Sequence, residues 1–434
     1  MKTTFLAVTS ITHLTRICFH NFLNVITPRT LINCWAKSDR PEAPQRARQI
    51  LECMTTGSDN PSLNIRPNTI TYAIVMDGYA RRGDIHGCLE VFETMKKDYH
   101  ENRNYSANPY MIRIYGTIMT AWSKSKLEEA PKESEKLMTD IIDLYSRGIM
   151  NEPPNHHTYS ILINCWSKSN HPNATTRSKE ILQTMIDKSK TKKGTNNDDD
   201  LRPNVIIYNS VMDACARHGD LDSALEIWEW LLNDTSGVRP NIRTYNTLIF
   251  AWSKIALGNS LKFSHSRSSE APYQAEKLLN KMIALYSNGT LKESPNTIAY
   301  SIVINCWSKS SNNPEAPQRA RNLLESMIAR SRDPNISSNC IPNEITYHSV
   351  LDAYSKHGDI TGALDIMNIM KEDYRSGNKL AKPELQTYSI LIDTWYVEFY
   401  FATRRFLLII PPEYQLPTNT VSCIWKPILT LVSF

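Results

Sequence analysis

The sequence has little of what would mark a membrane protein, a disulfide-bonded domain or a metal domain. Its nearest candidate for a membrane span, FLLII at 406–410, is far shorter than the roughly 20 residues that a transmembrane helix needs. None of the nine cysteines forms a Cys-x-x-Cys pair, and Cys34, Cys165 and Cys306 each precede a tryptophan in the same local context. Such cysteines are typical of small apolar packing residues in a reducing compartment. We therefore expect no membrane contact.

Glycine and charge are also sparse. Only 14 of 434 residues are glycine, and long β-branched runs are few, which favours helices over strands. The net charge of +5 is mild, so the positions of the charged residues, rather than their sum, must indicate the partner. A chain of this length holds two or three ordinary domains or one elongated array.

No group of residues suited to catalysis is found. The three aspartates at 198–200 are consecutive, and alternate side chains of such a run diverge. His218 and His357 recur before Gly-Asp in equivalent contexts, which favours a structural role. Residues 396–434 contain no histidine and a single Cys423, so they lack the His-x-Glu and Cys-x-x-Cys zinc site of a nucleotide deaminase. The sequence predicts a protein that is not an enzyme and has no cofactor and no metal.

What the sequence has instead is a repeat. The segment TYSILINCWSKS at 158–169 returns as AYSIVINCWSKS at 299–310, and a fragment of it, TLINCWAKS, stands at 30–38. Recurring tyrosines mark the units, and all but one follow a Pro-Asn or Pro-Glu pair. The shortest interval runs from Tyr208 to Tyr245 and the longest from Tyr245 to Tyr300. The full set is Tyr72, Tyr115, Tyr159, Tyr208, Tyr245, Tyr300, Tyr347 and Tyr388.

One unit, at 66–95, shows what each repeat forms. Tyr72 and Met76 are spaced for one face of a first helix, Gly83 interrupts that helix, and Asp84 can cap a second one. Two such helices cannot bury their apolar faces alone, so neighbouring units must stack. The sequence predicts an all-α protein, an α-solenoid of stacked helix-turn-helix repeats forming a right-handed superhelix, with about nine repeats across residues 28–395.

The units come in a fixed order of three kinds. Units with AWSK precede units with NCWSKS, and units with RHGD or KHGD follow, so that the larger period spans three units, as from Tyr208 to Tyr347. The tyrosine followed by a small polar residue, the preceding Pro-Asn, the Gly-Asp turn and a closing Met together resemble the pentatricopeptide repeat family over residues 28–395. The Trp and Gly-x-x-Tyr spacing of tetratricopeptide repeats is absent.

The resemblance implies that the chain binds single-stranded RNA with sequence selectivity, one nucleotide per repeat, in organelle RNA processing, stability or translation. It also implies that protein partners supply any catalysis. The alternative is a scaffold for protein–protein interaction built on the same solenoid. The two differ in whether a basic surface is required.

A basic residue stands nine positions after the tyrosine in seven units. This spacing is a half-turn from the tyrosine, so stacked first helices would align the cations along an RNA backbone. The alternative is that a cation late in a helix simply interacts with the helix dipole. The position is occupied by Arg81, Lys124, Lys168, Arg217, Lys254, Lys309 and Lys356.

The resemblance implies that each base is read by the residue after the tyrosine together with the last residue of the unit. It implies adenine for the two pairs that begin with Ser, a pyrimidine, C more than U, for the two that begin with Asn, and a weak purine preference for Gly116. The core target is then 5′-A-Y-Y-A-3′. As an alternative, an Asn after Pro is also a good helix N-cap. The pairs are Gly116 with Asn155, Ser160 with Asn204, Asn209 with Asn241, Asn246 with Asn296, and Ser301 with Asn343.

Some positions in or near these pairs are given no base or have two alternative roles. His348 with Glu384 departs from the family's usual pairs, and the unit of Ala73 lacks a closing Pro-Asn, so neither is given a base. In four units an isoleucine stands three residues before the residue that follows the tyrosine, where it would either wedge against base faces or belong to the core. These isoleucines are Ile70, Ile206, Ile298 and Ile345.

Both ends of the chain depart from the repeat. Residues 1–27 contain no Asp or Glu and many Thr, which resembles an organelle transit segment, mitochondrial or alternatively plastid; the other interpretation is a mispredicted start. Residues 396–434 are expected to be a non-repeat tail that arises from a gene-model artefact, because the repeat pattern stops within a helix.

Overall fold

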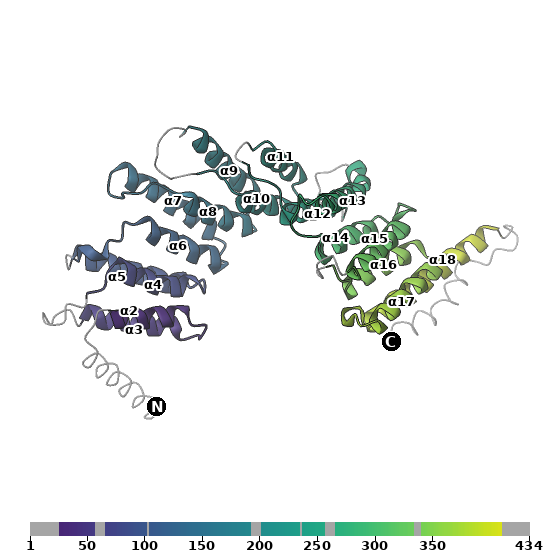
Figure 1. Cartoon of the computed structure of the whole chain (residues 1–434), viewed down its shortest axis with the longest axis horizontal. Coiled ribbons are helices and arrows are strands. Elements are labelled where there is room, and N and C mark those ends of the chain that lie inside the picture. Colours follow the sequence, from purple (N-terminus) through teal and green to yellow (C-terminus); the bar gives the residue numbers. More distant parts are fainter. Residues whose placement is uncertain are drawn as a thin grey trace, which may run out of the picture. The chain divides into compact units, whose positions relative to one another are not determined.

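Every regular element in the described part of the computed structural model is helical (Figure 1). The structure describes residues 26–56, 66–101, 104–191, 201–234, 237–256, 265–333 and 340–409. The first helices of the repeats are α2 (Ile26–Lys37), α4 (Thr69–Ala80), α6 (Ile112–Ser125), α8 (His156–Lys168), α10 (Val205–Arg217), α12 (Ile242–Ala256), α14 (Thr297–Lys309), α16 (Glu344–His357) and α18 (Leu385–Ile409). The second helices are α3 (Ala43–Thr56), α5 (Ile85–His100), α7 (Ala130–Ser146), α9 (Ala174–Thr191), α11 (Leu221–Leu232), α13 (His265–Ser287), α15 (Ala316–Ser331) and α17 (Ile360–Arg375). Two short 3-10 turns, η2 (Tyr105–Ala107) and η3 (Lys379–Ala381), follow α5 and α17.

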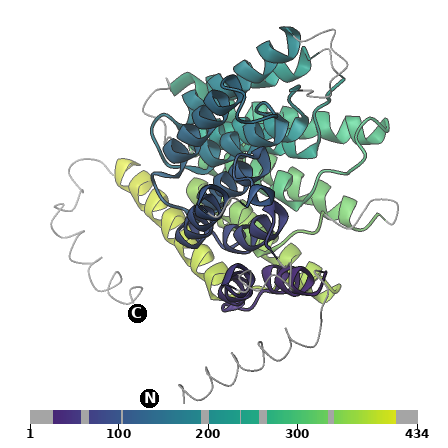
Figure 2. The ribbon, with the colours of Figure 1, turned by 90° about the vertical axis from the view of Figure 1, so that its left-hand side faces the viewer.

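The helices form two compact units. One unit comprises residues 1–218 with 226–238, and the other comprises 219–225 with 239–434. In the first unit α2, α4, α6, α8 and α10 lie side by side, each against the next, while α3, α5, α7 and α9 pack beside them; α2 and α3 are seen together in Figure 2. In the second unit α12, α14, α16 and α18 form one layer and α13, α15 and α17 the other. The predicted all-α solenoid of helix-turn-helix repeats is confirmed.

The recurring tyrosine anchors each repeat. It is the fourth residue of every first helix from α4 to α18. In seven of these helices its side chain is no more than 6% exposed, and only Tyr388 on α18 differs, at 46%. Burial of this large ring between the two helices of a hairpin explains why the sequence repeats it.

The turn between the helices behaves as the sequence predicts where it contains Gly-Asp. Gly83 and Gly358 adopt left-handed backbone angles, with φ of 71° and 66°, which glycine tolerates without strain. Asp84 and Asp359 then cap α5 and α17, each accepting a hydrogen bond from the backbone N–H three residues later.

The three repeats with this short turn share a hydrogen bond that sequence reasoning missed. In each, the phenol of the tyrosine donates to an aspartate 26 residues later on or just after the second helix. Burial, reinforced by the nearby carboxylate, raises the pKa of all three phenols, so the donor stays protonated. The bonds run from Tyr72 to Asp98 (3.2 Å), from Tyr208 to Asp234 (3.0 Å) and from Tyr347 to Asp373 (2.8 Å).

The predictions for the two ends concern mostly residues 1–25 and 410–434, which lie outside the described part of the chain. Helix α18 runs unbroken from Leu385 to Ile409, so no helix end marks the predicted boundary at 395. Among the described helices, none has the length and apolar character that a bilayer crossing requires.

Candidate nucleic-acid interface

In the second compact unit, the two members of each predicted base-reading pair are brought together. Nδ2 of Asn246 on α12 lies 3.5 Å from Oδ1 of Asn296, which caps α14. Ser301 on α14 shares a 2.8 Å hydrogen bond with the hydroxyl of Thr346. The Thr346 hydroxyl in turn donates to Oδ1 of Asn343 at 2.8 Å. The residue after the tyrosine is therefore linked to the closing asparagine of its own repeat.

Each closing asparagine also caps the next first helix, the alternative role that the sequence left open. Its Oδ1 accepts a hydrogen bond from a backbone N–H of the first turn. Nδ2 of Asn155, Asn204, Asn296 and Asn343 makes no hydrogen bond to any residue that the structure describes, so capping leaves these donors for a ligand. The N–H to Oδ1 distances are 3.1 Å at Asn155, 3.1 Å at Asn241, 3.1 Å at Asn296 and 3.0 Å at Asn343, while Asn204 accepts from two N–H groups at 3.0 and 3.1 Å.

The pairs of the first unit are less directly joined. Gly116 on α6 offers no side chain to Asn155. The hydroxyl of Ser160 on α8 donates to the carbonyl of His156 at 2.7 Å and makes no hydrogen bond to Asn204. The oxygen of Ser160 nevertheless keeps a lone pair for an external donor. Asn209 and Asn241 belong to different compact units.

The four isoleucines that stand three residues before the residue after the tyrosine are exposed, so the core alternative does not hold for them. Ile206, Ile298 and Ile345 are 63%, 59% and 67% exposed, and Ile70 is 37% exposed. Residues three apart share one face of a helix. Each isoleucine therefore stands beside the residue that follows the tyrosine on the same first helix.

The equivalent positions of the other repeats hold functional candidates that sequence reasoning missed. Arg113 on α6, His157 on α8 and Arg243 on α12 also stand three residues before the first member of a pair, and all three side chains are exposed. Neither Arg113 nor Arg243 has an acidic partner among the residues that the structure describes. Their common spacing from the tyrosine was the signal that could have found them.

Three of the seven predicted backbone-contacting cations are paired with an aspartate of their own helix. Each follows an aspartate by four residues on its own helix, the spacing of a helical ion pair. The pairs are Arg81 with Asp77 (2.9 Å), Arg217 with Asp213 (2.8 Å) and Lys356 with Asp352 (2.7 Å).

Two of these paired cations also hold neighbouring repeats together. Arg217 donates to the carbonyl of Ser167 at 2.6 Å and Lys356 to that of Ser308 at 2.8 Å, near the C-termini of the preceding first helices. A cation at this end also interacts favourably with the helix dipole. Burial lowers the pKa of Lys356, although Asp352 opposes the shift. Arg217 and Lys356 therefore have a structural role between neighbouring first helices.

The remaining cations are more available. Lys124 and Lys168 are exposed and have no acidic partner within the described ranges. Lys254 lies over the ring of Phe250, 5.1 Å from its centroid, and Lys309 reaches Asp352 of the next repeat at 3.3 Å. All four belong to repeats with AWSK or NCWSKS.

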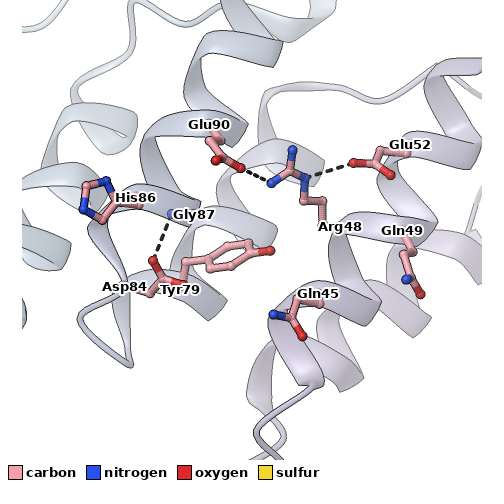
Figure 3. Close-up of a pocket in the computed structure, with 9 residues that line it drawn as sticks. All are labelled: Gln45, Arg48, Gln49, Glu52, Tyr79, Asp84, His86, Gly87 and Glu90. Atoms are coloured by element: carbon pink, nitrogen blue, oxygen red, sulfur yellow. Dashed lines mark hydrogen bonds and ion pairs between the residues drawn. The ribbon is translucent and has the colours of Figure 1, made fainter.

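A cavity of about 390 Å³ lies beside the second helices of the first unit (Figure 3). Arg48 of α3 lines this cavity and donates to Glu52 at 2.9 Å and to Glu90 of α5. Because these charges pair with one another, the cavity contains an ion-pair link between successive second helices. The second unit repeats the arrangement with Arg321, Glu325 (2.8 Å) and Asp365 (3.5 Å).

The histidines before Gly-Asp have backbone partners. Nδ1 of His218 lies 2.9 Å from the carbonyl of Ala214, and the two ring nitrogens of His357 lie 2.8 and 2.9 Å from the carbonyls of Ala353 and Asn313. Over the described residues, no three His, Cys, Asp or Glu side chains are placed to hold a metal ion.

Tyrosine-anchored helical hairpins with capping asparagines define a helical-repeat protein. A model of the PPR repeat matches residues 70–100 and 345–374, and a model of the PPR repeat family matches residues 203–254. A pentatricopeptide repeat-containing protein of Arabidopsis thaliana is 26% identical over 189 residues, which are 39% of this chain and 31% of that protein. Residues 70–100, 203–254 and 345–374 therefore match pentatricopeptide repeats, as the sequence predicts.

Solved structures of the maize pentatricopeptide repeat protein PPR10 are similar at 18% identity over 92% of this chain. The TM-score is 0.46 for PPR10 alone, of which 56% is covered. It is 0.45 for PPR10 in complex with an 18-nt psaJ RNA element, of which 53% is covered. The chain thus matches about a third of the Arabidopsis protein and little more than half of the maize protein.

Proposed function

We propose that this protein binds single-stranded RNA with sequence selectivity, one nucleotide per repeat. The observation that carries the proposal is an exposed isoleucine on the same first helix as a polar residue that is linked to the closing asparagine, as Ile298 and Ser301 are on α14, with Ser301 linked through Thr346 to Asn343. An unstacked base needs both kinds of contact, an apolar or aromatic surface for its face and hydrogen-bonding groups for its edge.

The pairs give the proposed order of bases. Ser160 and Ser301 leave room for a purine, whereas the longer Asn209 and Asn246 leave room only for a pyrimidine. The free Nδ2 groups of the closing asparagines described above donate to the base edge. Oδ1 of Asn246 is buried and has no hydrogen-bond partner among the described residues. The core target is 5′-A-Y-Y-A-3′.

Phosphate contacts in this proposal concentrate on Lys124, Lys168, Lys254 and Lys309. Their repeats carry no aspartate four residues earlier on the helix, so their charge is not cancelled within the helix. Arg81, Arg217 and Lys356 contribute less, because each pairs with an aspartate of its own helix, whereas Lys309 reaches Asp352 only across to the next repeat. A phosphate backbone would therefore meet the more available cations in two of every three repeats.

The biological role that we propose is non-catalytic. The chain would occupy or remodel a transcript in organelle RNA processing, stability or translation, in a mitochondrion or alternatively a plastid, while protein partners supply any chemistry. The absence of Asp and Glu from residues 1–27 supports a location in an organelle.

Fluorescence anisotropy with the full chain tests the proposal. We expect tighter binding to unstructured RNA containing A-Y-Y-A than to a matched strand containing Y-A-A-Y, with an affinity that falls steeply with salt. Equal binding to both strands would contradict the proposed order of bases and would still support RNA binding. Binding to neither would contradict the function and favour a protein-binding scaffold.

A further inference from the structure

Five first helices have a threonine directly before the tyrosine. It is the third residue of the helix, and in each case its side chain is no more than 3% exposed. Its hydroxyl accepts a hydrogen bond from the backbone N–H three residues earlier, which helps to cap the helix. These threonines are Thr71, Thr158, Thr244, Thr346 and Thr387.

In the second compact unit the same hydroxyl has an additional partner. Thr346 on α16 shares a 2.8 Å hydrogen bond with Ser301, the residue after the tyrosine of the preceding repeat. Oγ1 of Thr387 on α18 lies 2.8 Å from Nε2 of His348, which occupies the equivalent position one repeat later. Each threonine is therefore bonded both to the residue after one tyrosine and to the residue that closes that repeat.

The contacts of Thr346 fix the direction of its hydrogen bonds. A hydroxyl has one proton to donate, and that of Thr346 goes to Oδ1 of Asn343 at 2.8 Å. Ser301 is then the donor in its bond to Thr346, so its oxygen is left as an acceptor for a ligand while Nδ2 of Asn343 stays a donor. An acceptor and a donor complement the amino group and N1 of adenine, whereas guanine presents a carbonyl and an N–H at these atoms.

Repeats without the threonine arrange the pair differently. Ile207 on α10 has no hydroxyl, and Ser160 of the preceding repeat donates instead to a carbonyl four residues back on its own helix, at 2.7 Å. On α14 the position holds Ala299, and there Asn246 reaches Asn296 directly, at 3.5 Å. The direction in which the residue after the tyrosine points thus varies with the residue before the next tyrosine.

We propose that the residue before each tyrosine positions the base-reading pair of the preceding repeat, so that Thr346 restricts the fourth base of A-Y-Y-A to adenine. This inference rests on the proposed RNA binding. At the first base Ile207 replaces the threonine, and the Ser160 hydroxyl is held by its own helix. The first base therefore tolerates guanine better than the fourth, although both repeats carry the same pair of Ser and Asn.

Fluorescence anisotropy of the full chain with A-Y-Y-A, A-Y-Y-G and G-Y-Y-A strands tests this difference. For wild type, guanine at the fourth base should weaken binding about tenfold or more, and guanine at the first base less than about threefold. Thr346→Val replaces the hydroxyl by a methyl group and should reduce the penalty at the fourth base to that at the first. Thr346→Ser, which keeps the hydroxyl, should retain the penalty, and Ile207→Thr should raise the penalty at the first base.

Thr158→Val is the matched control. Thr158 also completes a capping box and is 1% exposed, but the residue after the preceding tyrosine is Gly116, which has no side chain to position. This variant should lower the thermal unfolding midpoint about as much as Thr346→Val does, because both lose a similar cap. It should leave the preference at the fourth base unchanged.

Three results would overturn this inference alone. Wild type would show equal guanine penalties at the two bases, or the preference at the fourth base would survive Thr346→Val. In the third, Thr158→Val would lose this preference as fully as Thr346→Val, since the effect would then come from helix capping. Wild type that binds none of the strands would contradict the proposed function as well, so the two failures are distinguishable.

Discussion

At the scale of single residues, the amide of a closing asparagine offers one atom to the helix cap and another to the proposed base. The oxygen of Asn343 accepts from the backbone N–H and the hydroxyl of Thr346, at 3.0 and 2.8 Å, and its nitrogen is left without a partner in the described part of the chain. The cap and the proposed base contact therefore use different atoms. They can be separated by mutation.

Two substitutions of Asn343 test the helix cap and the proposed base contact separately. Asn343→Asp keeps the capping oxygen, so stability should stay close to wild type, whereas Asn343→Ala should lose about 1 kcal/mol. Both should weaken the preference for adenine at the fourth base of A-Y-Y-A, because both remove the amide donor. Thermal unfolding and anisotropy measure the two effects. An Asp variant that keeps the full adenine preference would show that the amide does not read the base.

Buried thiols give a prediction that depends on pH. Burial raises the pKa of Cys88 and of Cys306 to about 12, well above the roughly 8.5 of a free thiol. Folding thus favours the protonated thiol. The resulting stability is complete below the pKa of the unfolded chain and is lost as pH rises from there toward the folded value.

Thiol labelling measures this protection. At pH 8 the exposed Cys34 and Cys53 should react quickly with a thiol reagent, while Cys88 and Cys306 should react only after denaturant is added. Denaturant midpoints should also fall as pH rises above about 8.5. Fast labelling of Cys306 in the native chain, read by peptide mapping, would contradict its buried environment.

At the scale of elements, a missing side chain sets how closely two helices approach. A Cβ added at Gly362 on α17 would lie 2.1 Å from the ring of Tyr354 on α16, and one at Gly87 would lie 2.3 Å from the ring of Tyr79. In the third repeat with Gly-Asp, Cys215 replaces the tyrosine and Ser223 replaces the glycine. The bulky ring and the glycine therefore occur together.

Gly362→Ala should destabilise the protein by roughly 1–3 kcal/mol, because the ring of Tyr354 must move from a packed position. Gly116→Ala is the control within a helix, since its nearest neighbour would be 3.8 Å away, and alanine there should stabilise by about 0.5–1 kcal/mol. Denaturant unfolding compares the two. Equal effects of the two substitutions would rule out the close approach.

Cations that pair within their own helix and cations that do not should differ in their effects on RNA binding and on stability. Lys168→Gln should reduce the slope of log affinity against log salt by about 0.7, the value for one phosphate contact of a single strand, and leave stability unchanged. Arg217→Gln should leave that slope nearly unchanged and lower stability by roughly 1 kcal/mol, since it loses its link to the carbonyl of Ser167. Reversed effects would show that Arg217 meets the RNA.

At the scale of the whole molecule, the repeat and its helices could be predicted because their signals are local. Pro-Asn before a helix, a tyrosine four positions into it and a Gly-Asp turn each act within a few residues of chain. The structure keeps all three, as at Asn343, Tyr347 and Gly358. The same local signals carried the resemblance to pentatricopeptide repeats.

The partners of the cations and the exposure of the isoleucines were harder to predict. Arg217 bonds a carbonyl 50 residues earlier and Lys309 an aspartate 43 residues later, contacts that exist only once repeats stack. Ile345 stands on a helix that is apolar on several sides, and periodicity alone did not tell the stacked side from the open one. The aspartates four residues before Arg81, Arg217 and Lys356 were visible in the sequence and could have been used.

The central claim is that the residue after the tyrosine selects the base. Its most direct test is the affinity of wild type and of a Ser160→Asn, Ser301→Asn double variant for strands containing A-Y-Y-A and Y-Y-Y-Y. The account predicts a reciprocal switch, wild type preferring the first strand and the variant the second, because both altered repeats would then carry the same two residue types as the pair of Asn246 with Asn296. Unchanged preference in a variant that still folds and binds RNA would contradict the account.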